Sequence, residues 1–278
     1  MATRPSAASV HRSTHGAANR ATDSKAFEYT ARAGFAASGV LHLLIGYIIG
    51  RLAFVGGGGN ADQSGALATL GSQTGGAIVL WVVAIGLAAL GLWRLAEAVI
   101  GAKPSEARQG DNPAWKRGKS VALAVVNFAI AFSAARFAMG SGQSSSQQNS
   151  GLSAQLMESG WGKALLLAVG VGFVAVGAYH VYKGVSEKFL DDLQVSGGTG
   201  IKAAGVIGYT AKGLALGGVG VLVVVATLQA DPSKASGLDA AVKTLGEAPF
   251  GKFLLIAAAL GIAAFGVYNF IRSRYNRM

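Results

Sequence analysis

The sequence predicts an all-α, polytopic membrane protein in which six transmembrane helices form three tandem two-helix repeats with a pseudo-threefold arrangement. Of its 278 residues, 51% are hydrophobic and only 13% are charged, whereas soluble domains are about 25% charged. The chain also has six apolar stretches of the roughly 20 residues that a helix needs to cross a bilayer. These stretches are 34–54, 77–100, 119–139, 163–183, 205–228 and 252–272.

A pattern of small residues occurs three times, in the second, fourth and sixth stretches. It begins at Gly76, Gly162 and Gly251, and each copy continues with a glycine, an alanine, a second glycine and an aromatic residue at the same spacing. The copies are Gly86, Ala89, Gly91 and Trp93; Gly172, Ala175, Gly177 and Tyr179; and Gly261, Ala264, Gly266 and Tyr268. Small residues let membrane helices approach closely, so the pattern predicts helix packing. Each two-helix repeat crosses the membrane twice, so successive repeats have the same orientation. This predicts a symmetry axis along the membrane normal.

The repeated glycines lie on two opposite faces of each return helix, the second helix of a repeat. At about 100° per residue, Gly91 and its equivalents share a face with Ala84, Gly170 and Ala259. Gly86 and its equivalents lie on the other face. We therefore expect each return helix to be wedged between two neighbours and to form the crowded interior. Bulky residues should be tolerated less well there than in the outward helices, the first helix of each repeat.

The chain divides into a tail and three repeats, at 29–101, 116–189 and 202–275. Residues 1–28 are polar and basic and lack the apolar core of a signal peptide, so we expect an uncleaved, disordered cytoplasmic tail. Each loop inside a repeat has a Ser-Gly pair followed by apolar residues three or four apart, at 66–71, 152–160 and 238–249. This spacing predicts short amphipathic helices that lie at the membrane surface or cap the bundle.

Basic residues are distributed unequally between the two sides. Sixteen lie in the tails and in the connections between repeats, and three lie in the loops inside repeats. The positive-inside rule then places both termini in the cytoplasm and the protein in the inner (plasma) membrane. This distribution accounts for much of the formal net charge of +11, so we expect no nucleic-acid partner.

Ionisable side chains at membrane depth are candidates for a polar path or for lipid contacts. They are His42, Arg51, Arg94, Glu97, Arg136 and His180. Arg94 and Glu97 are one turn apart and can pair. The equivalents of Arg94 are His180 and Asn269, and those of Glu97 are Lys183 and Arg272. The positions stay polar while their chemistry changes, and snorkelling at a helix end explains this as well as a functional site does.

His42 is the deepest of these residues. It shares a stripe with Ser38, Gly46 and Gly50, which favours a close helix contact. A proton or solute path is the alternative, because histidine titrates near neutral pH. Arg51 and Arg136 occupy matching places near the outer ends of their helices. They either snorkel or bind an anionic lipid headgroup.

The sequence carries no motif for catalysis, nucleotides or metals. It has no cysteine and lacks the GxxxxGK[ST], HExxH and GxSxG patterns. We therefore predict no enzymatic activity, no catalytic residue, no cofactor and no metal site.

The chain resembles a bacterial membrane family, the domain of unknown function 1206 (DUF1206). The matching marks are the starts of two outward helices, Gly34-Phe35 to Gly39 and Gly208-Tyr209 to Gly213, and the glycine and aromatic pattern of the return helices. The resemblance covers roughly 29–275, and the second outward helix departs from it by keeping only Gly118. It implies an integral membrane protein without an established activity, so it assigns no site residue.

Two functional hypotheses follow. The leading one is a non-enzymatic structural, accessory or scaffolding bundle, because the repeated positions are packing residues. The alternative is a small transporter or channel with a polar path between repeats, which would use His42, Arg94, Glu97 and His180. The bilayer is the expected partner, and an anionic lipid, a protein partner or a homo-oligomer is compatible with either hypothesis.

Overall fold

The computed structural model describes residues 25–56, 59–100, 113–195 and 197–276. Within these ranges the chain is helical, apart from turns and one isolated β-bridge between Leu193 and Asn276. Most of the expected tail lies outside the described residues. Residues 25–28, which we expected to belong to that tail, instead begin the first outward helix.

Six long helices match the six predicted spans. The outward helices are α2 (Lys25–Val55), α5 (Pro113–Ala138) and α8 (Thr199–Gln229), and the return helices are α4 (Gly76–Ile100), α7 (Gly160–Val185) and α10 (Gly251–Tyr275). Each contains a stretch that is long and apolar enough to cross a membrane. The predicted all-α membrane fold is therefore confirmed.

Short helices connect the long ones. Inside the repeats these are α3 (Gln63–Gly71), α6 (Ser145–Met157) and α9 (Leu238–Glu247), with the 3₁₀ turn η2 (Pro232–Ala235) before α9, while η1 (Lys188–Asp192) links the second and third repeats. The first glycine of each repeated pattern lies beneath the end of such a helix. A Cβ at Gly76, Gly162 or Gly251 would collide with the carbonyl oxygen of Leu70, Leu156 or Gly246, respectively. These glycines therefore let the loop helix fold back onto the start of the return helix.

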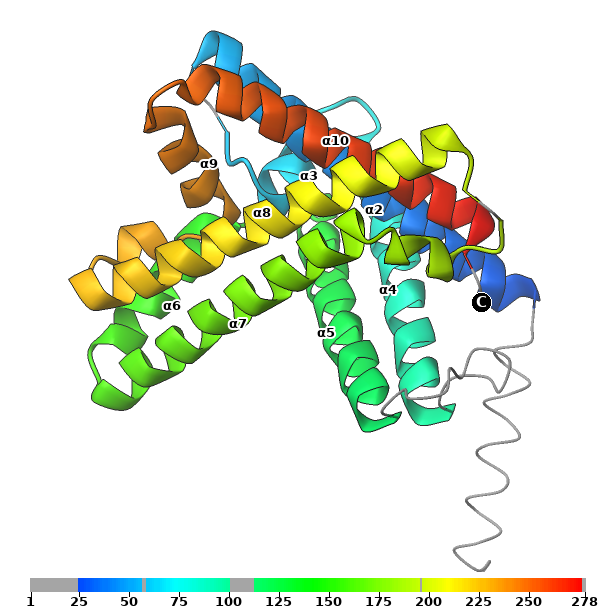
Figure 1. Cartoon of the computed structure of the whole chain (residues 1–278), viewed down its shortest axis with the longest axis horizontal. Helices are drawn as coiled ribbons and strands as arrows, with labels where there is room; N and C mark the ends of the chain where they lie inside the picture. Colours follow the sequence, from blue (N-terminus) through cyan, green and yellow to red (C-terminus); the bar gives the residue numbers. More distant parts are fainter. Residues whose placement is uncertain (1–24, 57–58, 101–112, 196, 277–278) are drawn as a thin grey trace, which may run out of the picture.

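The most extensive helix pairs join neighbouring repeats, not the two helices of one repeat. Figure 1 shows α4 beside α5, α7 beside α8 and α10 beside α2. Each pair combines a return helix with the next outward helix, and the α10–α2 pair closes the ring from the last repeat to the first. This cyclic order is the pseudo-threefold arrangement.

Glycines bring the backbones of these pairs together. An added Cβ at Gly177 in α7 would lie 2.6 Å from the carbonyl oxygen of Gly213 in α8, and the reverse distance, from Gly213 to the oxygen of Gly177, is also 2.6 Å. In the α10–α2 pair, a Cβ at Gly266 would lie 3.0 Å from the oxygen of Gly39. Because both helices of a pair contribute glycines, the outward helices are as crowded as the return helices. The expectation that outward helices tolerate bulk better is wrong at these positions.

The second face of the return helices differs between repeats. Gly86 in α4 lies against α2, where an added Cβ would be 3.3 Å from the backbone of Ala33, and a Cβ at Gly261 in α10 would collide with Ala211 in α8. Gly172 in α7 has nothing within 4 Å of the added Cβ. Its predicted packing role is therefore wrong, because α5 and α7 do not share an extensive interface in the described residues. Gly118, the glycine that α5 retains, also faces open space.

The main apolar core lies between α2, α4, α5 and α10, at the end of the bundle that carries the loops inside the repeats. We call this the loop end and the opposite one the termini end. Ile45 and Ile49 of α2 and Leu80 and Leu87 of α4 are at most 1% exposed there. Helices α3 and α9 cap this core, with Leu67 and Val242 buried in it.

Candidate functional site

An aromatic cluster lies between the second and third repeats, toward the termini end. It consists of Phe189, Tyr209, Phe265 and Tyr268, all buried. The ring of Tyr209 lies 5.3 Å from the rings of both Phe265 and Tyr268, in edge-to-face or near edge-to-face geometry. The Tyr268 hydroxyl donates a hydrogen bond to the carbonyl oxygen of Phe189 (2.9 Å), so its polar end is satisfied inside the cluster. The cluster fills the space where η1, α8 and α10 meet.

The two candidate histidines contact this cluster from different helices. His42 of α2 lies 4.9 Å from the ring of Phe265, and His180 of α7 lies 5.8 Å from the ring of Tyr209. In both residues Nδ1 is within hydrogen-bond distance of the carbonyl oxygen four residues earlier, 2.7 Å in His42 and 2.8 Å in His180. The fold thus brings both histidines to one region, with the rings of Phe265 and Tyr209 between them.

A shared carboxylate joins two equivalent basic residues at the termini end. Asp192 of η1 lies 2.6 Å from Nζ of Lys183 and 4.0 Å from the guanidinium of Arg272. Burial acts to raise the pKa of Asp192, but the positive charges of Lys183 and Arg272 outweigh it and hold that pKa below its ordinary value. Sequence reasoning missed Asp192. Its only signal was an acidic pair in the connection between the second and third repeats.

Cations above aromatic rings extend this region to the first repeat. Arg94 and Glu97 form the predicted ion pair at 2.8 Å, and the guanidinium of Arg94 lies 6.0 Å from the ring centre of Phe35. Arg272 lies over the same ring at 4.4 Å, within the range of a cation–π contact. Phe35 is therefore where charged residues of the first and third repeats meet.

The loop end has a polar network that sequence reasoning also missed. Asp62 is 3% exposed. One of its oxygens accepts hydrogen bonds from the Gly65 amide and the Ser64 hydroxyl, and the other accepts one from Ser146 of the second repeat (3.1 Å). Asp239 of the third repeat accepts a hydrogen bond from the Ala61 amide at 2.9 Å. The usable signal was a carboxylate beside a Ser-Gly pair in two of the three loops.

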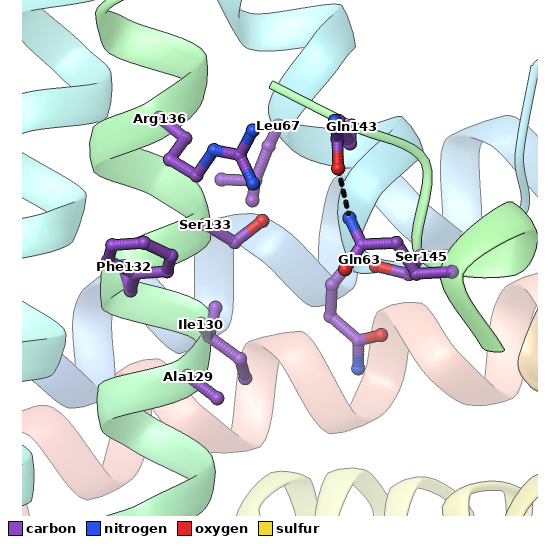
Figure 2. Close-up of a pocket in the computed structure, with 10 residues that line it drawn as sticks. Gln63, Leu67, Ala129, Ile130, Phe132, Ser133, Arg136, Gln143 and Ser145 are labelled. Atoms are coloured by element: carbon purple, nitrogen blue, oxygen red, sulfur yellow. Dashed lines mark hydrogen bonds between the residues drawn. The ribbon is translucent and has the colours of Figure 1, made fainter. Parts of the chain in front are cut away.

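A pocket of about 300 Å³ lies at the loop end beside α5. Its lining comes from α5, α3 and the start of α6: Gln63, Leu67, Ala129, Ile130, Phe132, Ser133, Arg136, Gln143, Ser145 and Gln148. Figure 2 shows Arg136 and Ser133 projecting from α5 toward the side of the pocket that Gln63 and Gln143 form. Arg51, the matching residue of the first repeat, is exposed on α2 and does not line this pocket.

In the described part of the chain, no group of three or more His, Cys, Asp and Glu side chains is placed to hold a metal ion. Three ion pairs of the described residues gather at the connection between the second and third repeats: Lys183–Asp192, Arg272–Asp192 and Lys202–Glu187. The arrangement can hold helices together through ion pairs and cation–π contacts, and the pocket at Arg136 can accept an anion.

Comparison with known proteins gave two matches. The family model described as Domain of Unknown Function (DUF1206) matches three segments, 33–101, 118–187 and 207–276. The chain is also 28% identical over 254 residues to "Uncharacterized protein YxxB" of Bacillus subtilis (strain 168), across 89% of this chain and 90% of that protein. No solved structure matched.

Proposed function

This chain belongs to the DUF1206 family of membrane proteins, here with three repeats, and we propose that it acts as a non-enzymatic structural or accessory bundle with a sealed centre. One observation carries the proposal. The route from His42 toward the loop end is filled by the apolar core, in which Ile45 and Ile49 are each 1% exposed. On the other side of His42 lies the ring of Phe265.

The aromatic cluster supports the same proposal. The buried rings of Phe265 and Tyr209, 5.3 Å apart, lie beside the two histidines. The ammonium of Lys212 stands 4.2 Å from the centre of the Phe265 ring, and that of Lys183 stands 5.2 Å from the centre of the Tyr209 ring. Water needs several polar partners to occupy a buried site, and the cation–π contacts of Lys212 and Lys183 take up these ring faces instead. The two histidines are thus better suited to helix contacts than to relaying a solute.

Polar ties between repeats also favour a structural role. Asp192 links Lys183 of the second repeat to Arg272 of the third at one end of the bundle. Asp62 links the first repeat to Ser146 of the second at the other end. Losing one partner of a buried charged hydrogen bond is costly, so these contacts fix the mutual positions of the repeats.

The absence of cysteine makes the sealed centre directly testable. Single variants Leu41→Cys and Ile45→Cys place a thiol in the core, and Ser141→Cys places one on an exposed loop. Proteoliposomes would be treated with a membrane-impermeant thiol reagent, added outside or enclosed inside. We expect Ser141→Cys to react from one side and the two core variants to react from neither.

Reaction of either core variant with the water-soluble reagent would contradict the sealed centre and favour the small transporter. Labelling after detergent denaturation checks that every thiol is present and reactive. Leu43→Cys, on an exposed position of the same helix, serves as a lipid-facing control that should react with a lipophilic maleimide.

A further inference from the structure

The pocket at Arg136 opens on a helix face that no other helix covers in the described residues. Ala131 and Ala134 of α5 are buried against the core, whereas Phe132 is 66% exposed. The corresponding outward helices, α2 and α8, pack extensively against the return helix of their own repeat, but α5 and α7 do not. A strip of α5 is therefore left to the surrounding bilayer, and the pocket lies where this strip reaches the loop end.

The upper part of the pocket is rich in hydrogen-bond donors. Arg136 and Ser133 come from α5, Gln63 from α3, Gln143 from the turn before α6, and Gln148 from the first turn of α6. The Gln148 amide donates a hydrogen bond to the side-chain oxygen of Gln143 (3.3 Å), which leaves the amide hydrogens of Gln143 for another acceptor. No carboxylate lines the pocket. Its chemistry suits a phosphate, which a guanidinium binds through two parallel hydrogen bonds.

The lower part of the pocket is apolar. Ala129, Ile130 and Phe132 lie on α5 toward the middle of the membrane span, below Ser133 and Arg136 (Figure 2). Arg136 follows Ala129 by seven positions, which corresponds to about 10 Å along a helix. A ligand that fills both parts needs an anionic group at one end and a hydrocarbon chain at the other.

We propose that this pocket binds an anionic phospholipid, with the phosphate at Arg136 and an acyl chain along the open face of α5. Arg136 has no carboxylate beside it in the pocket, so a net negative headgroup complements it better than a zwitterionic one. Gln63 and Gln143 supply neutral donors to the remaining phosphate and headgroup oxygens. The inference does not depend on the sealed centre, since a transporter with the same α5 would bind the lipid equally well.

Arg51 supplies the matched control. It occupies the equivalent place near the end of α2 but is exposed and outside the pocket. Simple snorkelling of an arginine toward the membrane surface predicts the same lipid preference from both residues. A built site predicts that Arg136 alone matters.

The test is native mass spectrometry of the full chain in detergent, titrated with phosphatidylglycerol or phosphatidylcholine carrying identical acyl chains. We expect the wild type and Arg51→Gln to bind one phosphatidylglycerol about tenfold more tightly than phosphatidylcholine, and Arg136→Gln to lose that preference. Ala129→Trp fills the apolar part while keeping Arg136, and should weaken binding of phosphatidylglycerol by a similar factor. Because Ala129 is exposed, this variant decides the question if Arg136→Gln fails to fold.

Equal binding of the two lipids by the wild type, an unchanged preference in Arg136→Gln, or undiminished phosphatidylglycerol binding in Ala129→Trp would overturn the proposal. Loss of the preference in Arg51→Gln as well would show snorkelling without a specific site. The last measurement is a competition between inorganic phosphate and phosphatidylglycerol. If it displaces phosphatidylglycerol at millimolar concentration in the wild type but not in Arg136→Gln, the pocket is a small-anion site and the lipid assignment is wrong.

Discussion

Gly177 and Gly172 lie on opposite faces of α7 and meet different surroundings. Gly177 is pressed against the α8 backbone, while Gly172 has open space around it. In the first and third repeats the equivalents of Gly172 do face another helix. The comparison shows that a glycine repeated in all three copies does not make the same contact in each. Whether it packs depends on whether another helix lies against it in that repeat.

The largest effect should separate these two glycines. Gly177→Leu places a side chain into a space where even a Cβ would be 2.6 Å from backbone atoms, so we expect a loss of about 3 kcal/mol or more in stability. Gly172→Leu should change stability by no more than about 0.5 kcal/mol. Thermal unfolding in detergent measures both, and equal losses would mean that α5 and α7 pack together after all.

The next prediction concerns the equivalent of Gly172 in the third repeat. There the same face of the return helix, at Gly261, packs against another helix. Gly261→Ala adds a methyl group that collides with Ala211 of α8, and should cost about 2 to 3 kcal/mol. Adding Ala211→Gly should recover most of that loss, because the new methyl group takes the place of the old one. A double-mutant cycle gives the coupling, and additive effects would place the contact elsewhere.

A smaller loss of stability is expected from breaking the hydrogen-bond network of Asp62, which joins the loops of the first and second repeats. Asp62→Ala leaves the Gly65 amide and the Ser64 and Ser146 hydroxyls without their acceptor, which should cost about 2 kcal/mol. Glu247→Ala, at an exposed position at the end of α9, is the control and should behave like the wild type. If Asp62→Ala also leaves the unfolding temperature unchanged, the network does not hold the second repeat in place.

The smallest effect concerns pH at the junction of the second and third repeats. The pKa of Asp192 is lowered by Lys183 and Arg272 although burial opposes this. Its contribution is therefore complete above the unfolded pKa, ordinarily about 3.9, and is lost as pH falls below that value through the folded pKa. Asp192→Asn should cost about 1.5 kcal/mol at neutral pH and flatten the acid side of the stability profile. Glu187→Gln should keep the wild-type profile, and an unchanged slope in Asp192→Asn would refute the assignment.

The spans and the threefold repeat could be predicted because they depend on local properties. Apolar length identifies a membrane helix directly, and the glycine pattern marks which faces are small. Neither property shows which helix packs against which. The sequence pattern is equally compatible with a hairpin within each repeat and with the exchange seen here, in which α7 packs on α8 and α10 on α2.

The polar sites were harder to predict for the same reason. Arg94 and Glu97 could be paired because they are three residues apart. Asp62 and Ser146 are separated by 84 residues, and Asp239 and Ala61 by 178. Only the folded chain brings such residues together. The sequence placed Arg136 near a helix end with anionic lipid as one alternative, but the pocket around it depends on how α3 and α6 fold over α5.

The closure of the ring through α10 and α2 has a consequence for biogenesis. Chains are made from the N-terminus onward, so α2 enters the membrane first and its principal partner last. Until α10 is inserted, the face of α2 with Gly39 and Gly46 has only lipid against it. A chain that stops before the final helix therefore leaves this glycine face of α2 without the helix that packs on it in the finished protein.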